Sequence, residues 1–170
     1  MPINITYREA EPSDAGKFLE NCKIVGAETD NLTFGAEGLS LSISQEADFI
    51  RKFAGNPGSI MLVAFDEGEL IGTGAVSVIS GKPRIAHRRE IAISVRKDYW
   101  GKGIGTGLMN LLLDFAKKSG AEVLELEVRS DNEAAIALYK KFGFEKAGRN
   151  EKFFKINGEF FSADYMNLYL

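Results

Sequence analysis

Residues 99–107 read YWGKGIGTG and place glycine at four alternate positions, Gly101, Gly103, Gly105 and Gly107. A strand-like segment, EIAISV, precedes this stretch, and an apolar run with helical spacing follows it. Glycine inside a helix costs about 1 kcal/mol relative to alanine, so glycines at a helix start need a compensating role. The first helical turn has free N–H groups and the positive end of the helix dipole, and glycine lets a phosphate approach closely. The stretch therefore predicts a phosphate-binding turn between a strand and a helix.

Two common phosphate motifs do not fit this stretch. A P-loop requires Lys-Ser or Lys-Thr after its last glycine, and neither occurs at that spacing. The dinucleotide fingerprint G-x-G-x-x-G requires a sixth-position glycine, but that position is Thr106 counted from Gly101 and Leu108 counted from Gly103. A plain flexible turn and a third kind of phosphate motif both stay open at this point.

Length and composition are those of one globular domain. The chain has 170 residues, 45% hydrophobic and 26% charged, and no repeat or low-complexity block divides it. A formal charge of −3 disfavours nucleic acid as a partner, because proteins that bind phosphate backbones usually carry a basic excess. One cysteine and one histidine cannot form a Cys/His zinc cluster, so we expect no metal. No signal pattern or membrane-length apolar run is present, so we expect a cytoplasmic location and no membrane partner.

Hydrophobic periodicity and turn signals predict the element order βααβββαβαββ. The predicted strands are Ile3–Arg8, 59–65, 70–79, 85–95, 123–128, a return to strand from Phe144 onward, and a hairpin of 153–156 and 160–170 that turns at Asn157-Gly158. The predicted helices begin after Pro12 and cover 45–53, 104–118 and 132–141, the last opened by a capping box of Ser130 and Glu133. A long surface loop is predicted over 27–44. The segment 90–128 has the length of a parallel βαβ crossover, which favours a mixed α/β (α+β) fold whose sheet is mostly antiparallel with a central parallel pair, flanked by helices on both faces.

Three stretches together resemble the GCN5-related N-acetyltransferase (GNAT) family. Residues 100–105, WGKGIG, resemble its pyrophosphate-binding signature, Gln/Arg-x-x-Gly-x-Gly/Ala, although Trp100 stands where the family more often has Gln or Arg. Residues 127–148, EVRSDNEAAIALYKKFGFEKAG, resemble the family's next strand and helix, and residues 5–14 resemble its first strand and helix start. The resemblance implies a single N-acetyltransferase domain over residues 1–170. It is similar to the branches that act on small amines, amino acids and ribosomal-protein N-termini.

The resemblance implies acetyl-CoA as the acyl-donor cosubstrate, with no metal. The backbone of Ile93, Ser94 and Val95 would pair with its pantetheine arm, and Asn132 would contact that arm. The backbone amides of the glycine stretch would hold its pyrophosphate. These amides belong to Gly101, Lys102, Gly103, Ile104, Gly105 and Thr106.

Catalysis, by the same resemblance, would require Tyr139 and a glutamate. Tyr139 follows Asn132 by seven residues, which places both on one helix face, and it would also bind the cofactor and protonate the leaving CoA thiolate. The acceptor ammonium must lose a proton before its nitrogen can attack the thioester, and Glu90 and Glu127 are the two candidate bases. Family branches differ in which position they use, so the choice stays open. Transfer would occur by direct attack within a ternary complex.

A non-catalytic acyl-CoA-binding or regulatory module of the same fold is the alternative function. Tyr139 together with an available carboxylate favours the enzyme, and the missing Lys-Ser/Thr disfavours an ATP-binding protein. The expected partner is a small-molecule or peptide amine acceptor, and the resemblance implies that a homodimer can form.

Two features could shape the acceptor site. Phe160, Phe161 and Tyr165 could wall an acceptor pocket or could fill the core of the terminal hairpin. The acidic residues of the long loop, Glu28, Asp30 and Glu37, could attract a cationic acceptor.

Overall fold

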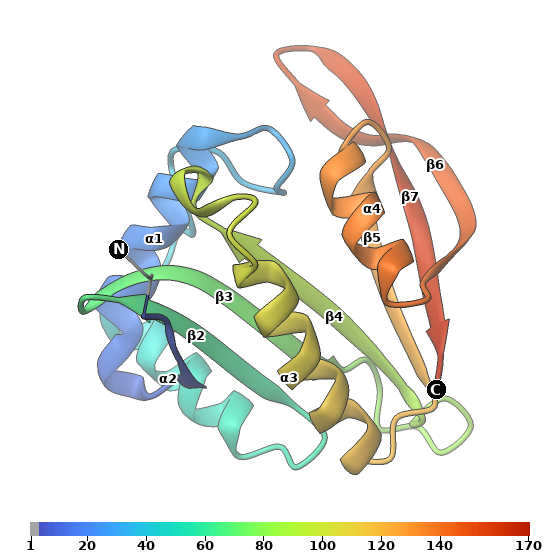
Figure 1. The fold of residues 1–170 in the computed structure, drawn as a ribbon, viewed down its shortest axis with the longest axis horizontal. Coiled ribbons are helices and arrows are strands. Elements are labelled where there is room, and N and C mark those ends of the chain that lie inside the picture. The colour runs from blue at the N-terminus through green and yellow to red at the C-terminus, as the bar shows by residue number, and fades with distance from the viewer. Residues whose placement is uncertain (1–3) are drawn as a thin grey trace.

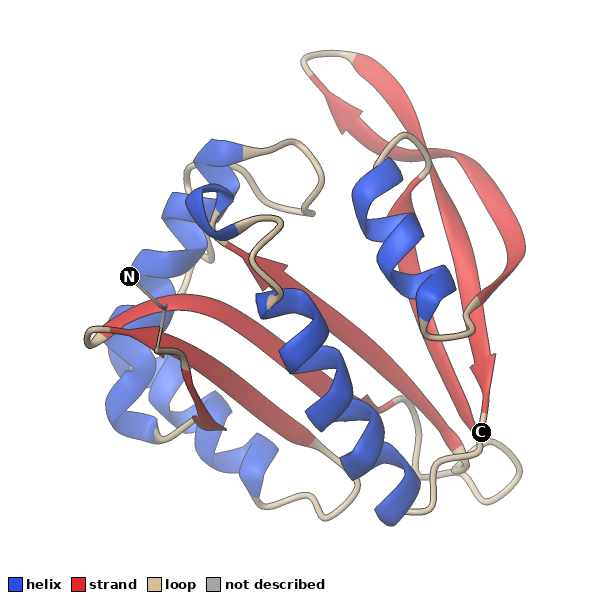
Figure 2. Ribbon diagram, viewed as in Figure 1, coloured by secondary structure: helices blue, strands red, loops and turns tan. Residues whose placement is uncertain are grey.

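A seven-stranded sheet with helices on both faces forms the frame of the computed structural model, which describes residues 4–170 (Figures 1 and 2). The strands are β1 (Thr6–Glu9), β2 (Ile60–Asp66), β3 (Glu69–Val78), β4 (Arg88–Val95), β5 (Val123–Arg129), β6 (Glu145–Ile156) and β7 (Glu159–Tyr169). The α-helices are α1 (Ala15–Glu28), α2 (Ile43–Ala54), α3 (Ile104–Lys118) and α4 (Glu133–Lys141). Two short 3-10 turns, η1 (Pro12–Asp14) and η2 (Lys97–Tyr99), precede α1 and the glycine stretch.

The sheet order is β1-β2-β3-β4-β5-β7-β6, and among the strands of residues 4–170 only the pair β4 and β5 runs parallel. The predicted mixed fold with a central parallel pair is therefore confirmed. Helices α3 and α4 lie on one face, and α1 and α2 lie on the other (Figure 2). The α3 crossover from β4 to β5 explains the pairing, because parallel neighbours need a long connection.

Strand β2 contributes to both cores because its side chains alternate between the two faces. Leu62 and Ala64 pack with the α3 residues Leu108 and Leu112 in one buried cluster. Met61 and Val63 belong to a second cluster that contains α1 and α2 side chains. A separate apolar layer therefore covers each face of the sheet.

The parallel ladder between β4 and β5 is short. Its Cα partners are Arg88 with Val123, Arg89 with Leu124 and Glu90 with Glu125. Beyond Glu90 the two strands diverge toward the carboxyl end of β4, and Figure 1 shows the resulting wedge between them. Backbone groups on the inner edges of this wedge lose their sheet partners, so the wedge is where a ligand can pair with the protein.

Some sequence expectations need correction at their boundaries. Strand β4 begins at Arg88, because residues 85–87 form turns. The capping box of Ser130 and Glu133 is wrong: Asn132 is the N-cap of α4, whereas the Ser130 hydroxyl donates to Asp164 Oδ1 at 2.9 Å. The long loop is shorter than predicted, because α1 runs to Glu28 and α2 begins at Ile43. Ile3, the first residue of the predicted β1, lies outside the described residues.

The Glu46 carboxyl, on α2, is a polar group without a partner inside the α1–α2 layer. The residue is 1% exposed, and neither carboxyl oxygen has a hydrogen-bond partner among the described residues. Burial raises the pKa of Glu46, so the folded chain keeps this proton to higher pH than the unfolded chain does. Below the unfolded pKa both states are protonated. As the pH rises above it, the unfolded chain releases its proton first and the free energy of unfolding decreases.

Replacing this side chain by one of similar size without charge should therefore stabilise the protein. We expect Glu46→Met to raise the free energy of unfolding by about 1–3 kcal/mol at neutral pH, because it removes an unpaired buried polar group. The gain should be smaller near the unfolded glutamate pKa of about 4.3. Denaturant unfolding at both pH values measures it. The exposed acid Asp48 on the same helix is the control, and Asp48→Asn should change stability by less than about 1 kcal/mol. A loss of stability in Glu46→Met at neutral pH would contradict this account.

Candidate active site

A cleft of about 820 Å³ occupies the wedge between β4 and β5. Side chains from both faces of the sheet line it. Asn132, Leu138 and Tyr139 lie on the α3–α4 face, and Phe18 of α1 belongs to the apolar layer of the other face. The cleft therefore passes through the sheet, and two ligands can enter it from opposite sides. Of the residues that the sequence assigned to cofactor binding or catalysis, all except Lys102 line this cleft.

The exposed edge of β4 offers free backbone groups to the cleft. The Arg96 N–H donates to the Ile71 carbonyl at 2.9 Å, which fixes the alternation of the antiparallel β3–β4 ladder. By that alternation Ser94 exchanges backbone hydrogen bonds with Thr73. The N–H and C=O groups of Ile93 and Val95 instead point toward β5, which no longer pairs with them at this level. An extended ligand with amide groups can bond to Ile93 and Val95, as a further strand would.

Two glycines give the glycine stretch its backbone shape. Gly101 has φ of 71° and Gly103 has φ of 81°, a left-handed conformation that side chains rarely adopt. Gly103 is the N-cap of α3, and its carbonyl accepts the first helical hydrogen bond from the Gly107 N–H at 2.9 Å. The N–H groups of residues 101–106 have no acceptor among the described residues. A run of free donors at a helix N-terminus is suited to bind phosphate oxygens.

The other two glycines serve close packing. A Cβ on Gly105 would lie 3.1 Å from Leu138 Cδ2, so Gly105 lets α4 approach α3. A Cβ on Gly107 would lie 2.5 Å from the Tyr7 hydroxyl oxygen, which means that Tyr7 occupies that space. Gly107 is therefore needed for the fit of β1 against α3. It is not a phosphate donor, because its N–H already bonds to the Gly103 carbonyl.

Trp100 connects the glycine stretch to β4. Its indole N–H donates to the Val95 carbonyl at 2.7 Å, and the residue is 47% exposed at the edge of the cleft. This bond takes one of the backbone groups that β4 presents toward β5. The Ile93 N–H and C=O and the Val95 N–H are left free on that edge. The sequence alone gave no reason for a tryptophan at this position, and the structure supplies one.

Asn132, the N-cap of α4, and Tyr139 on α4 both line the cleft. The Asn132 side chain accepts a hydrogen bond from the Ala135 N–H at 3.3 Å, so it caps the helix. Tyr139 is only 7% exposed, and its ring centroid lies 5.7 Å from that of Phe144. Its hydroxyl has no hydrogen-bond partner among the described residues, although Tyr139 lines the cleft. Burial raises the pKa of Tyr139 to about 12, which keeps its proton in place at any neutral pH.

Glu90 and Glu127 lie on the other face of the sheet. Each alternates with buried neighbours that pack on the α3–α4 side, such as Ile91 and Leu126, so both carboxylates point away from that core. Burial raises the pKa of Glu127, and the negative charges of Glu90 and Glu125 raise it further. A carboxyl with a raised pKa is a better proton acceptor at neutral pH. The two candidate bases thus share one site and influence each other.

Several residues suggested by the sequence do not line the cleft. Lys102 lies outside it, with its ammonium 5.0 Å from the centroid of the Tyr99 ring. The acids proposed to attract a cation are engaged elsewhere. Glu28 accepts from the Lys97 N–H and Glu37 from the Gly35 N–H, and neither lines the cleft. Asp30 also lies outside the lining and gives only its backbone carbonyl to Arg129.

The aromatic wall comes from a different part of the hairpin than the sequence suggested. Phe153 and Phe154 of β6 line the cleft, whereas Phe160, Phe161 and Tyr165 do not. A register shift between Asn150 and Phe154 makes this part of β6 irregular, and no pattern in the sequence predicts that shift. Phe160 instead packs under Lys152 and Lys155.

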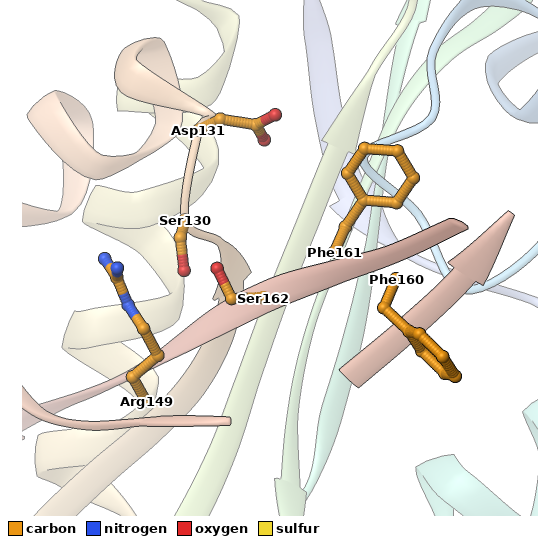
Figure 3. A pocket seen from close by; sticks show the side chains of 6 residues that line it. All are labelled: Ser130, Asp131, Arg149, Phe160, Phe161 and Ser162. Atoms are coloured by element: carbon orange, nitrogen blue, oxygen red, sulfur yellow. The ribbon is translucent and has the colours of Figure 1, made fainter. Parts of the chain in front are cut away.

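A smaller hollow of about 340 Å³ lies where β5 ends beside the hairpin (Figure 3). Ser130, Arg149 and Phe161 are among its lining residues. Its one cation and one of its hydroxyls are already paired: Arg149 and Ser130 both donate to Asp164, which holds the pKa of that carboxyl far below its usual range. This hollow therefore offers a ligand little that is not already bonded within the protein.

Residues 4–170 offer neither a membrane-spanning helix nor a metal site. No helix in this part of the chain is long and apolar enough to cross a membrane. Nor does this range contain a group of three or more His, Cys, Asp or Glu side chains arranged to hold a metal ion.

Comparison with known proteins gives a consistent result. The model of the acetyltransferase (GNAT) family matches residues 28–144. The chain is 36% identical over 112 residues to the N-alpha-acetyltransferase RimI of Mycobacterium tuberculosis, covering 66% of this chain and 68% of that one. It is 33% identical over 116 residues to the L-amino acid N-acetyltransferase AaaT of Escherichia coli, covering 68% and 71%. The crystal structure of a GNAT-family acetyltransferase from Streptococcus pneumoniae superposes with a TM-score of 0.94 at 30% identity, covering 98% of this chain and all of that one.

Proposed function

Since the chain belongs to the GNAT family of acetyltransferases, we propose that its cleft transfers an acetyl group from acetyl-CoA to a primary amine by direct attack in a ternary complex. The protein is an acetyl-CoA-dependent N-acetyltransferase. We propose beyond this the kind of acceptor, the route of transfer and the residues that perform it. We also propose that residues 1–170 form one N-acetyltransferase domain. Its relatives, named as an N-alpha-acetyltransferase and an L-amino acid N-acetyltransferase, support a primary amine as acceptor.

The single observation that carries the proposal is that free backbone N–H groups lie beside a cleft that passes through the sheet. Residues 101–106 present unpaired N–H groups at the start of α3, which fit a pyrophosphate. The free backbone groups of Ile93 and Val95 fit the amides of a pantetheine arm. Acetyl-CoA held in this way would bring its thioester to the part of the cleft between Tyr139 and the two glutamates.

The proposed reaction uses both faces of the sheet. The amine enters from the α1 side and loses its proton to the Glu127 carboxylate, whose raised pKa suits a general base. Its nitrogen then attacks the thioester carbon, so that a C–N bond forms as the C–S bond breaks. The Tyr139 hydroxyl donates a proton to the departing sulfur and is reprotonated from solvent. The second proton of the acceptor nitrogen, which becomes acidic once the C–N bond forms, leaves to solvent. No covalent bond to the protein is formed.

Glu90 takes a supporting part in this proposal. It lies at the point where the β4–β5 ladder ends, and its charge raises the pKa of Glu127. The sequence left the choice between the two glutamates open. The raised pKa of Glu127 favours it as the base, and Glu90 becomes the group that tunes it.

The chain contains a single tryptophan, Trp100, and this provides a direct test of donor binding. We expect acetyl-CoA to change the fluorescence of Trp100, because the indole lies at the edge of the cleft beside the glycine stretch. Trp100→Phe keeps an aromatic ring but loses the hydrogen bond to Val95. That change should weaken acetyl-CoA binding by about 2- to 10-fold, the value of one hydrogen bond, measured by calorimetry.

A control on the same segment separates this effect from general loosening. Tyr99→Phe removes the hydrogen bond from the Tyr99 hydroxyl to Asp66 but leaves the bond of Trp100 in place. It should bind acetyl-CoA more tightly than Trp100→Phe does. Calorimetric binding of acetyl-CoA to the wild type with no change in Trp100 emission would place the donor elsewhere and contradict the proposal.

Acetyl transfer itself is tested by release of the CoA thiol with a panel of primary amines. We expect at least one amine to release the thiol and to gain the acetyl group in equal amount. Tight acetyl-CoA binding with no acceptor in the panel would favour a non-catalytic binding module.

A further inference from the structure

The charges that line the cleft are all negative. Among the described lining residues, Glu90 and Glu127 are the charged side chains, and no lysine, arginine or histidine accompanies them. A ligand in this part of the cleft therefore meets two carboxylates and no fixed cation. The negative charge of the cleft comes from the two glutamates that line it and not from the net charge of the chain.

The nearest arginines on the same two strands are committed to other groups. Arg88 forms a bidentate ion pair with Glu125, with distances of 2.7 Å to both carboxylate oxygens. Arg89 donates to backbone carbonyls, including that of Gly58. Arg129 is paired with Asp131 and lies over the Phe161 ring at 3.9 Å. None of these arginines is free to bind a carboxylate that enters the cleft.

Most of the rest of the acceptor side is apolar, and the polar side chains of the loop after α1 that line it, Thr29, Asn31 and Thr33, are uncharged. Side chains from α1, from the loop that follows it and from β2 and β6 line this region, and they are Phe18, Leu32, Phe34, Leu39, Met61 and Phe153. The loop is held across the cleft, because the Asp30 carbonyl accepts from Arg129 of β5 at 3.1 Å. An amine bearing an apolar group can bury that group here while its nitrogen lies near the glutamates.

The charge of a free α-amino acid is unfavourable in this cleft. Its carboxylate is one carbon away from its amine, so it must enter the same region as Glu90 and Glu127. There it would meet two like charges without a cation to pair with, in surroundings that water screens less than bulk solvent does. In a peptide the same carboxyl is an uncharged amide, and this repulsion disappears.

Resting on the proposed function, we propose that the acceptor is an amine with an apolar neighbour and without a free carboxylate beside it. The N-terminal residue of a peptide and a simple arylalkylamine both have this chemistry. Free amino acids are poor acceptors. The substrate class is thus set by two uncompensated carboxylates that line an apolar cleft.

A matched set of acceptors tests this inference. The set is L-phenylalanine, L-phenylalaninamide, 2-phenylethylamine and a peptide amide that begins with phenylalanine, all with the same ring. The amine of the amide is less basic than that of phenylalanine and the amine of 2-phenylethylamine is more basic, so basicity cannot favour both. We expect kcat/KM to be roughly 30- to 100-fold higher for the acceptors without a carboxylate, the size expected for repulsion by two partly screened charges.

Two variants show whether the cleft charges cause the preference. Glu90→Gln should reduce the ratio of kcat/KM for phenylalaninamide over phenylalanine by about 5-fold or more, because one of the two like charges is gone. This ratio does not depend on any loss of rate that both acceptors share. Glu122→Gln is the control, because Glu122 is exposed, lies outside the cleft lining and pairs with no arginine among the described residues, and it should leave the ratio close to that of the wild type.

The outcomes separate the inference from the proposed function. Equal kcat/KM for phenylalanine and its amide, with acetylated product from both, would overturn the inference and leave the proposed function standing. No acetylated product from any acceptor, with acetyl-CoA bound, would overturn both. Higher kcat/KM for all three acceptors without a carboxylate than for phenylalanine supports the inference, and the ranking of the peptide against 2-phenylethylamine then identifies which source of amine the site selects.

Discussion

Glu127→Gln should lower kcat by about 10²- to 10⁴-fold, the range that removal of a general base produces. The glutamine has nearly the same size and keeps a carbonyl oxygen in place, but it cannot take a proton from the acceptor ammonium. The free energy of unfolding should change little, because Glu127 is only partly buried, points into the cleft and away from the packed core, and has no ion-pair partner among the described residues. The expected loss is therefore in the reaction step, with acetyl-CoA affinity retained.

Two further variants separate the role of Glu127 from those of the neighbouring glutamates. Glu125→Gln changes a glutamate of the same strand that lies outside the cleft and is paired with Arg88, so it should cost only a few-fold in kcat. Glu90→Gln should keep much of kcat but move its acid limb to lower pH. The sign follows because the Glu90 charge raises the pKa of Glu127, and removing that charge lowers it. A large loss in Glu90→Gln with little loss in Glu127→Gln would show that the two roles are exchanged.

Tyr139→Phe should lower kcat by about 10- to 100-fold, a smaller decrease than the one expected for Glu127→Gln. The pKa of Tyr139 is raised to about 12 by burial, so its proton is present at every physiological pH. The same shift makes it a weaker acid toward a thiolate, whose ordinary pKa is about 8.5. The Tyr139 hydroxyl therefore first stabilises the departing sulfur through a hydrogen bond, and its proton reaches the sulfur only as the C–S bond finishes breaking. No basic limb from Tyr139 is expected in kcat below about pH 11.

The phenylalanine keeps the ring against Phe144, so acetyl-CoA affinity and stability should stay near those of the wild type. Tyr7→Phe is the matched control, because Tyr7 is also a partly buried tyrosine with a raised pKa but packs against Gly107 outside the cleft. It should leave kcat unchanged. Unaltered kcat in Tyr139→Phe would remove the tyrosine from the reaction and point to solvent as the proton source.

Local signals predicted the elements that lie on either side of the cleft. The bounds 104–118 of α3 follow from the glycine stretch before it and from Ser119 and Gly120 after it, and the structure has the same bounds. The Asn157-Gly158 turn is confirmed with positive φ of 52° and 84°, as a two-residue hairpin loop requires. These features are set by residues close together in the chain, which is why the sequence is enough.

Contacts between distant segments could not be predicted in the same way. The register shift in β6 brings Phe153 and Phe154 to the cleft, and it depends on how β6 meets β7. The hydrogen bond of Ser130 to Asp164 spans 34 positions and competes with the local capping box, which it replaces. In both cases a tertiary partner outweighs a local preference.

The glycine stretch shows the same division within nine residues. Its sequence predicted a phosphate-binding turn, and Gly101 and Gly103 have the left-handed backbone that presents free amides. Gly105 and Gly107 are explained by Leu138 and Tyr7, which come from elements that only the fold brings near. Trp100, a departure from the family signature, is likewise explained by its bond to the Val95 carbonyl.

Initial-rate kinetics with both substrates varied is the most direct test of the central claim. Acetyl-CoA is varied at several fixed concentrations of the fastest acceptor in the amine panel, while thiol release and acetylated amine are both measured. Direct attack in a ternary complex predicts double-reciprocal lines that intersect, with thiol and acetylated amine formed in equal amounts. Parallel lines, which indicate a covalent acetyl-protein intermediate, or thiol release without acetylated amine would contradict the account.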